Sequence, residues 1–292
     1  MYVFALLAPA FWALNNVFIK FLLTNKFKSY FPTIAIISTA DTVFALTISA
    51  FTPIEVNFPF FLFAMLAGLL PLSGFWFYSK AMLIEDVSRV VTLFQLIPVF
   101  VVFLSVVFLN EVLGVQRYLG IGLVVVAATL ISYKLGGKAF SRAVRFMVPF
   151  ALIIAIYTIV DKALLGYLDF WSLFFWNIFG TFLGAMSLLS RSKLRGVLAA
   201  TIASVGKKVF VVTFVGEGMY VTGTLCSLVA LSLVEAPLAS AFFGLQPFYV
   251  FFYILFLSLF LPRILKEDIS KTSISLKIAA IVLMFIGTWL VI

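Results

Sequence analysis

The chain contains two similar segments that lie half its length apart: residues 81–100 read AMLIEDVSRVVTLFQLIPVF, and residues 230–249 read ALSLVEAPLASAFFGLQPFY. They align without a gap at an offset of 149 residues in a chain of 292, with four identical positions. One identical position is a proline, Pro98 in the first segment and Pro247 in the second. Because similarity at a fixed offset is typical of repeated architectures, the alignment predicts two related halves. Chance similarity between two apolar stretches is the alternative.

Around these segments the chain is too apolar for a water-soluble protein. Hydrophobic residues make up 64% and charged residues 11%, with a mean hydropathy of +1.23, whereas soluble proteins are about one quarter charged. Ten stretches are long and apolar enough to cross a bilayer as helices. They are continuously apolar rather than alternating, which favours helices over a β-barrel. The expected spans are Tyr2–Leu23, Phe31–Phe51, Phe58–Tyr78, Ser88–Leu109, Val115–Tyr133, Phe146–Leu165, Phe170–Leu189, Val209–Leu231, Ala236–Leu261 and Ile274–Ile292.

Two halves of five spans each have a consequence for topology. Because five is odd, the second half enters the membrane from the opposite side. The predicted fold is therefore an all-α polytopic membrane protein, with ten transmembrane helices arranged as two inverted five-helix repeats. The repeats occupy residues 1–135 and 146–292, joined by a basic linker loop at residues 136–145. In transporters built from inverted repeats, the substrate site lies between the halves near the middle of the bilayer.

The charged residues outside the spans predict the orientation. The net charge is +9, and most Lys and Arg fall in the loops after spans 1, 3, 5, 7 and 9. Because basic loops face the cytoplasm, both termini are predicted to lie outside, in a multi-pass protein of the cell (plasma) membrane. This bias explains the net charge, and we expect no nucleic acid partner. The basic loop residues are Lys26, Lys28, Arg89, Lys138, Arg142, Arg145, Arg191, Lys193, Arg195, Lys207, Lys208, Arg263, Lys266 and Lys271.

The chain lacks the residues that many catalytic and metal sites use. It has no histidine and a single cysteine, Cys226, which excludes a Ser-His-Asp triad, a histidine metal site and an internal disulfide. No Walker A motif is present, so transport driven directly by ATP is not expected. We expect no metal ion and no cofactor, and proton chemistry has only carboxyl groups to use.

One predicted span carries a polar stripe with a carboxylate near its middle. Glu217 lies where a charged side chain costs at least ~2.5 kcal/mol, which makes it a functional candidate. Polar residues on either side recur at intervals of four and three, which places them on one helix face. The stripe lines either a water-filled cavity or a polar contact between helices. Its members are Thr213, Glu217, Tyr220, Thr224 and Ser227.

Asp41 is a second carboxylate in the middle of a predicted span. Loss of hydration favours the neutral form of a carboxyl group, so a membrane-embedded carboxyl group can exchange a proton. Glu217 and Asp41 are therefore the predicted proton-coupling residues. The alternative for Asp41 is a structural ion pair.

Other polar side chains within the spans are candidates for substrate binding. Trp12, Asn16 and Lys20 follow one another at intervals of four and share a helix face. Lys20 either binds an anionic group or extends to the cytoplasmic interface. Pro98 and Pro247 remove backbone hydrogen bonds in mid-span and are the predicted hinges. The predicted substrate-binding residues are Trp12, Asn16, Lys20, Trp76, Gln95, Tyr157, Glu217, Tyr220, Thr224 and Gln246.

Two further features are interpreted as structural. Asp161 and Lys162 are adjacent near the end of a span, which favours a position at the membrane interface. Gly180 and Gly184 form a GxxxG pair, which is typical of close helix packing.

The residues that open and close the first half resemble a known family. FWALNNVFIK, at residues 11–20, resembles the start of an EamA domain, and LFQLIPVFVVFLSVVFLNEVLGVQRYLGIGLVVVAATLI, at residues 93–131, resembles its end. The whole chain is similar to two-EamA-domain members of the drug/metabolite transporter superfamily. The resemblance implies a ten-helix carrier that moves small polar metabolites by alternating access.

The chain also departs from this family's pattern. Many relatives carry an arginine in the second span where this chain has Asp41, and relatives commonly keep both termini in the cytoplasm. The second half is looser, with an insertion before Glu267, the counterpart of Glu111.

Together these features predict a transporter and not an enzyme. The expected function is secondary active transport of a small polar metabolite by alternating access, with proton coupling as an option. The abundant aromatic residues favour an amino acid or related compound, in keeping with amino acid export. A channel or facilitator for small solutes or sugars, and an integral membrane enzyme, are the alternatives. The expected partners are a small-molecule substrate and the lipid bilayer, with the protein as a monomer or homodimer.

Overall fold

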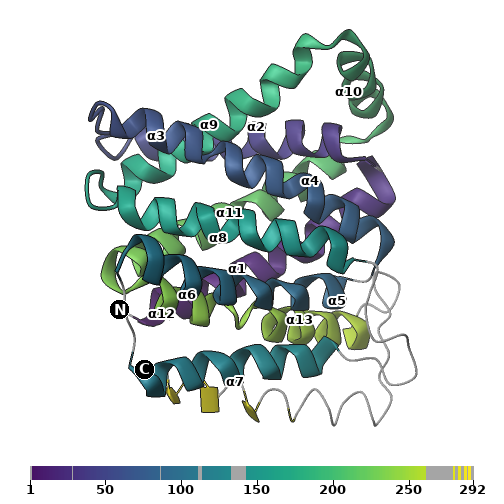
Figure 1. Cartoon of the computed structure of the whole chain (residues 1–292). Coiled ribbons are helices and arrows are strands. Elements are labelled where there is room, and N and C mark those ends of the chain that lie inside the picture. The colour runs from purple at the N-terminus through teal and green to yellow at the C-terminus, as the bar shows by residue number, and fades with distance from the viewer. Residues whose placement is uncertain are drawn as a thin grey trace.

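A computed structural model shows a bundle of helices that lie side by side (Figure 1). It describes residues 2–27, 29–85, 87–110, 114–132 and 143–260, and a few single residues further on. These are Ala279, Val282, Leu283, Ile286, Gly287, Trp289 and Leu290. Every regular element in this part of the chain is helical, in agreement with the predicted fold class.

The helices of the first half begin and end close to the predicted spans. The helix α1 (Tyr2–Phe21) continues into a π-helical turn at Leu22–Phe27. The others are α2 (Tyr30–Ser49), α3 (Phe60–Ala67), α4 (Leu69–Ile84), α5 (Val87–Thr92), α6 (Leu96–Phe108) and α7 (Val115–Ser132).

The second half continues in the same way. Its helices are α8 (Val144–Leu164), α9 (Phe170–Ser187), α10 (Ser192–Ser204), α11 (Lys207–Leu233), α12 (Ala236–Phe243) and α13 (Gln246–Phe260). Asp169 caps the N-terminus of α9, because its carboxylate accepts hydrogen bonds from the backbone N–H groups of Trp171 (2.7 Å) and Ser172 (3.1 Å).

Seven helical segments of the described chain are long and apolar enough to cross a membrane. They are Tyr2–Phe27, Tyr30–Ser49, Phe60–Ile84, Val144–Leu164, Phe170–Ser190, Lys207–Leu233 and Ala236–Leu257. Two shorter apolar segments, Leu93–Phe108 and Val115–Ala127, coincide with the predicted fourth and fifth spans. Most of the predicted tenth span and most of the linker at 136–145 lie outside the described residues, as do Glu111 and Glu267.

The fourth and ninth spans are interrupted helices. A 3-10 turn at Leu93–Gln95 separates α5 from α6, and Gly244 and Leu245 separate α12 from α13. Pro98 and Pro247 each lie in the first turn of the second segment, where a missing backbone N–H breaks no helical hydrogen bond. The predicted kinks are therefore breaks in the helix, located just before each proline.

Small residues let α9 approach α3 and α4. A Cβ atom on Gly180 would lie 1.9 Å from the carbonyl oxygen of Met65, and one on Gly184 would lie 2.6 Å from the Leu69 side chain. Thr181, between them, donates a hydrogen bond to the carbonyl of Gly68 (2.6 Å). The GxxxG pair therefore packs helices together, as predicted.

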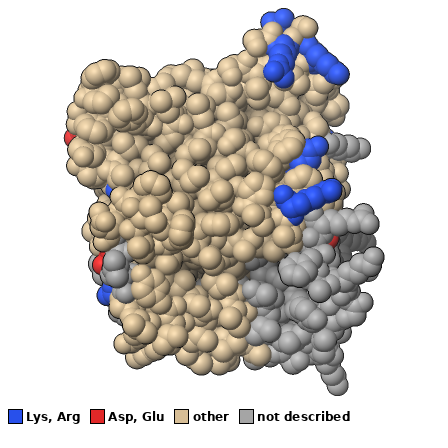
Figure 2. All heavy atoms as spheres, viewed as in Figure 1, with Lys and Arg blue, Asp and Glu red and all other residues tan. Residues whose placement is uncertain are grey.

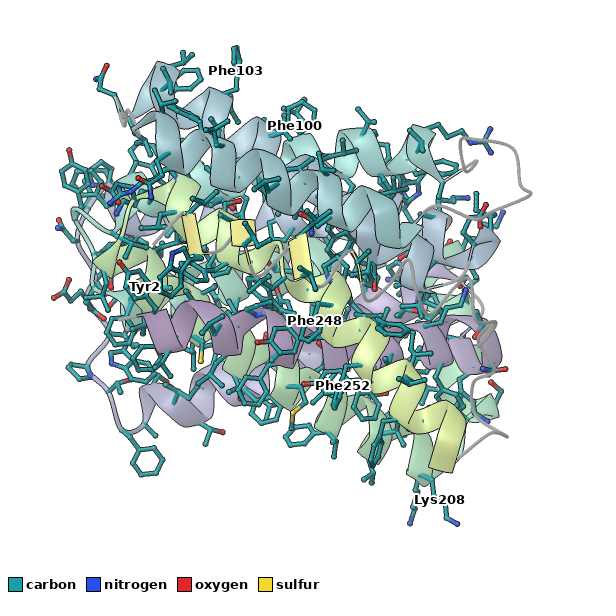
Figure 3. All side chains as sticks on the ribbon, turned by 90° about the horizontal axis from the view of Figure 1, so that it is seen from below. Tyr2, Phe100, Phe103, Lys208, Phe248 and Phe252 are labelled. Atoms are coloured by element: carbon teal, nitrogen blue, oxygen red, sulfur yellow. The ribbon has the colours of Figure 1, made fainter. Side chains whose placement is uncertain are left out.

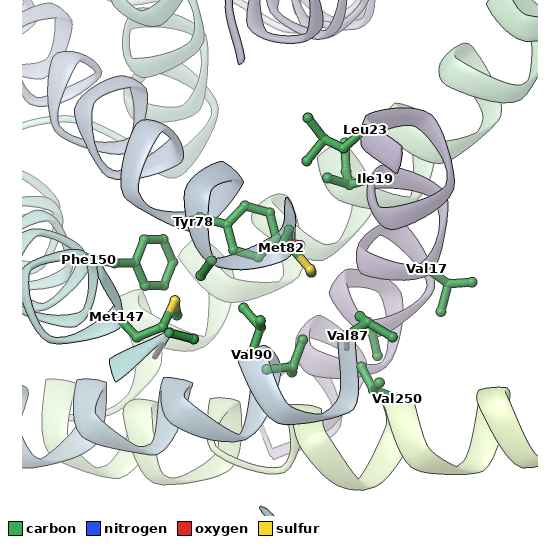
Figure 4. Close-up of a cluster of buried hydrophobic side chains, with 14 of the residues drawn as sticks. Val17, Ile19, Leu23, Tyr78, Met82, Val87, Val90, Met147, Phe150 and Val250 are labelled. Carbon is green, nitrogen blue, oxygen red and sulfur yellow. The ribbon is translucent and has the colours of Figure 1, made fainter. Parts of the chain in front are cut away.

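Two apolar clusters fill the bundle at different levels along α1. The Tyr78 cluster joins α1, α4, α5, α8 and α13, and its side chains point into the space between these helices (Figure 4). The Phe242 cluster joins α1, α8, α11 and α12 near the start of α1. Members of the Tyr78 cluster include Ile19, Leu23, Tyr78, Met82, Val90, Met147 and Phe150; members of the Phe242 cluster include Ala5, Ile159, Leu231, Val234 and Phe242.

The outer surface is apolar along the bundle and charged at its ends. Phe103 and Phe252 point away from the bundle and are 66% and 56% exposed (Figure 3), as expected for side chains that face lipid. Tyr2 and Lys208 lie at opposite ends (Figure 3). On the face drawn in Figure 2, Lys and Arg gather at the end where α10 lies, and α1 begins at the other end (Figure 1).

Candidate functional site: a central cavity with paired carboxyl groups

A cavity of about 220 Å³ lies within the bundle. Residues of α1, α2, α4, α6, α8, α9, α11, α12 and α13 line it. Most predicted site residues contribute to its wall. These are Trp12, Asn16, Asp41, Pro98, Tyr157, Glu217, Tyr220, Thr224 and Gln246.

Two carboxyl groups meet at the wall of the cavity. Asp41 on α2 and Glu217 on α11 are 5% and 2% exposed, and their carboxyl groups lie within hydrogen-bonding reach of each other. None of the Lys and Arg side chains that the structure describes forms an ion pair with either group. Within the same part of the chain, no N–H or hydroxyl group donates to Asp41 Oδ1. The structural ion pair considered for Asp41 is therefore absent from the described residues.

The polar stripe of α11 turns its central residues toward the cavity. Glu217, Tyr220, Thr224 and Ser227 line it, whereas the hydroxyl of Thr213 donates to the carbonyl of Val209 (2.9 Å). The stripe is therefore mainly cavity wall.

Asn15 holds Glu217 in place. Its Nδ2 atom donates to Glu217 Oε1 (3.3 Å) and to the carbonyl oxygen of Gly216 (3.0 Å). Gly216 also lets α11 approach α1 closely, because a Cβ atom on it would lie 3.0 Å from the Phe18 side chain. Asn15 was not among the predicted site residues, since the spacing of four selected its neighbour Asn16.

A third carboxylate, Asp161 on α8, also lines the cavity. It is 1% exposed, accepts a hydrogen bond from Asn177 Nδ2 (2.9 Å) and is hydrogen-bonded by the Tyr157 hydroxyl. Asn177 also donates to the Tyr157 hydroxyl oxygen (3.1 Å). The interfacial position favoured from the sequence is therefore wrong for Asp161. Tyr220 lines the same cavity and is near enough to Asp41, Asp161 and Glu217 to interact electrostatically with all three.

Aromatic rings cover much of the remaining wall. Trp12 donates from Nε1 to Thr224 Oγ1 (3.3 Å) and packs edge-on against Phe243, with ring centroids 5.3 Å apart. On the other side, Tyr78 donates to Asn16 Oδ1 (2.8 Å) and packs against Phe150 with centroids 5.7 Å apart. The cavity therefore offers flat apolar surfaces beside its acidic groups.

Four predicted residues lie outside the cavity wall: Lys20, Trp76, Gln95 and Pro247. Trp76 is 41% exposed and lies under the Lys80 ammonium group, 5.6 Å from its ring centroid. Gln95 is buried at the break in the fourth span and donates to the carbonyl of Gly244 at the break in the ninth. The two breaks are therefore in direct contact.

Lys20 and Lys162 make matching contacts at the ends of two helices. Lys20 donates to the carbonyl oxygens of Met82 (2.5 Å) and Glu85 (2.7 Å), where α4 ends. Lys162 donates to those of Leu231 (2.8 Å) and Val234 (2.7 Å), where α11 ends. These acceptors lie 149 residues after their counterparts, which is the offset of the sequence repeat. Cations favour helix C-termini, where carbonyl groups lack partners.

Comparison with known proteins places this architecture in a family. The profile of the EamA-like transporter family matches residues 1–133. A protein of Sinorhizobium sp., described as an uncharacterized transporter in the cobO 3′ region, is 30% identical over 131 residues, which cover 44% of this chain and 93% of that protein. The chain belongs to the EamA-like transporter family. It is a multi-pass integral membrane protein and a transporter.

The likeness of fold to a solved structure extends over the whole chain. One solved structure, titled only as a crystal structure of a protein, superposes with a TM-score of 0.68 at 13% identity, covering 100% of this chain and 98% of its own. At that identity the likeness concerns the fold alone. It shows that the second half of this EamA transporter completes a known helical arrangement.

The lysine contacts give a prediction for stability. Substituting Lys20→Met or Lys162→Met leaves two carbonyl groups at a helix C-terminus without a donor, which costs about 1–3 kcal/mol. We expect each variant to unfold at a lower temperature than the wild type in thermal unfolding of the detergent-solubilised protein.

Lys80→Met is the matched control, because Lys80 is exposed and its ammonium group lies over the Trp76 ring. Its expected cost is below about 1 kcal/mol. Equal unfolding temperatures for all three variants would contradict a capping role for Lys20 and Lys162.

Proposed function

We propose that this EamA transporter is a proton-coupled secondary carrier that moves a small polar metabolite, an amino acid or a related amine, by alternating access. The observation that carries the proposal is that two buried carboxyl groups, those of Asp41 and Glu217, lie next to each other at the cavity wall without a basic partner among the described residues.

The pair is suited to proton exchange because of its isolation. Two like charges in contact repel strongly where water is excluded, so the pair holds at least one proton, shared between the two groups. Gain or loss of a proton there changes the charge of the cavity wall by one unit. A substrate in the cavity therefore experiences a different site in each protonation state, which is the requirement for coupled transport.

Alternating access is supported by the symmetry of the contacts. The acceptors of Lys20 and Lys162 are related by the repeat offset, and the breaks in the fourth and ninth spans touch through Gln95 and Gly244. We take residues 1–135 and 146–292 as the two inverted repeats. In such carriers one repeat rocks against the other around a central site.

A carrier is favoured over a channel by the position of the two clusters. Along α1, Ala5 of the Phe242 cluster lies before the cavity residues Trp12 and Asn16, and the Tyr78 cluster packs beside them from Ala13 and continues beyond them to Ile19. Apolar packing on both sides of the cavity suits a site that opens to one side at a time, rather than a continuous pore.

The orientation follows from charge. Lys and Arg gather at the α10 end of the bundle (Figure 2), and we propose that this end faces the cytoplasm of the cell membrane. The start of α1 then faces outward, as the loop charges predict.

Coupling is tested with Glu217→Gln in proteoliposomes that contain a pH-sensitive dye. We expect phenylalanine or phenethylamine to drive a proton flux through the wild type, and Glu217→Gln to lose it because an amide cannot carry the proton. Glu55→Gln, which changes an exposed loop carboxylate, is the control and keeps the flux. Full transport with unchanged pH dependence in Glu217→Gln would show that Glu217 is not the coupling group.

Orientation is tested with single cysteines in a Cys226→Ser background. Ser204→Cys, at the end of α10, is expected to react with a membrane-impermeant thiol reagent only after the cells are opened. Ala50→Cys, which follows α2 at the other end, is expected to react in intact cells. The reverse pattern would refute the proposed orientation.

A further inference from the structure

We infer that the cavity selects a protonated organic amine that has a ring-sized apolar body and lacks a carboxylate, with its ammonium group at Asp41 and Glu217. This inference rests on the proposed transport function and narrows its substrate class.

The charged residues of the cavity wall favour a cation. Three carboxyl groups line the cavity, those of Asp41, Asp161 and Glu217, while none of its described lining residues is Lys or Arg. The two lysines of the neighbouring spans, Lys20 and Lys162, are directed at backbone carbonyl groups instead. A cavity with acidic groups and no base in its wall attracts a cation.

The cavity wall also contains a hydrogen-bond acceptor without a donor. Asp41 Oδ1 is buried and lacks an N–H or hydroxyl donor within the described chain, although buried polar atoms are nearly always satisfied. An ammonium group supplies three N–H donors and a positive charge to such an acceptor. The unfilled acceptor therefore matches an amine.

The length of the cavity wall suits a ring attached to that amine. Thr224 lies seven positions after Glu217 on α11, a rise of about 10 Å along the helix. At the Thr224 end, Trp12 and Phe243 present an edge-on pair of rings. An arylalkylamine spans this distance, with its ammonium group at the carboxyl pair and its ring against Trp12.

A zwitterionic amino acid fits this wall less well. Its carboxylate would enter a site with three carboxyl groups and no described basic side chain, at the cost of its hydration. One lining donor, Asn16 Nδ2, has no acceptor in the described chain. A single neutral amide suits a hydroxyl or carbonyl oxygen of the ligand, and it does not replace a basic partner for a carboxylate.

Binding should depend on pH because protons and the amine compete for the same carboxyl groups. The titratable groups facing the pair are Tyr78 on α4, Tyr220 on α11 and, beyond Tyr220, Asp161 on α8. The α1 helix faces it with the neutral amides of Asn15 and Asn16.

The test is calorimetric titration of the full-length protein in detergent with three ligands of one shape: phenethylamine, L-phenylalanine and 2-phenylethanol. They present the same phenyl ring with a cation, a zwitterion and a neutral hydroxyl group. At neutral pH we expect phenethylamine to bind at least about tenfold more tightly than the other two. Its affinity should fall at mildly acidic pH, whereas that of 2-phenylethanol should not.

Variants test which carboxyl groups cause the preference for phenethylamine. Glu217→Gln and Asp41→Asn should each remove the preference and its pH dependence, while Glu235→Gln, which alters a half-buried carboxylate paired with Arg117 at 3.7 Å outside the cavity wall, should keep both. If either cavity variant fails to fold, the ligand preference and pH dependence of the wild type decide the matter.

Each failure has a distinct meaning. Equal or tighter binding of L-phenylalanine, or absence of phenethylamine binding, overturns the amine class. The proposed proton-coupled transport is overturned only if the proteoliposome proton flux is also absent for L-phenylalanine and phenethylamine alike.

Discussion

The close contact between the buried carboxyl groups of Asp41 and Glu217 is the interaction on which the function of this transporter depends. Two carboxyl groups can remain together inside an apolar bundle only if they share a proton or meet a cation, since charge without compensation is costly there. The contact exists because α11 packs against both α2 and α1, and because Asn15 fixes the Glu217 side chain from the α1 side. The helix packing thereby builds a site whose charge must be balanced from outside the protein chain.

The remainder of the bundle shows how such a site is held within a membrane. Lys20 and Lys162 each cap a helix that contributes to the cavity wall, α4 and α11, so that two basic side chains near the site serve backbone carbonyl groups. The fourth and ninth spans break where they meet each other, beside the cavity, and exposed backbone at this depth is tolerated only where protein or a polar cavity satisfies it. Gly180 lets the backbones of α3 and α9 lie in direct contact.

Much of the fold could be predicted from the sequence, because long apolar runs allow few alternatives in a bilayer. Nine expected spans have helical counterparts in the described residues, and a helix, α10, occupies the connection between α9 and α11.

Glu217 and its polar stripe could be found from periodicity alone. The partner carbonyl groups of Lys20 and Lys162 could not, since a backbone acceptor has no side-chain signature. Asp161 was misplaced because its position near a span end suits an interfacial residue as well as a cavity residue. The contact between Asp41 and Glu217 depends on helix packing across 176 positions of sequence, which no local pattern encodes.

The most direct measurement of the central claim is difference infrared spectroscopy of the purified protein at neutral pH. If Asp41 and Glu217 share a proton, the wild type shows the carbonyl stretch of a protonated carboxyl group, and the same component disappears in both Asp41→Asn and Glu217→Gln. Asp161→Asn should retain that component, which separates the pair from the third acid. A spectrum without a protonated carboxyl group at neutral pH, or a component that survives both substitutions, would contradict the shared proton.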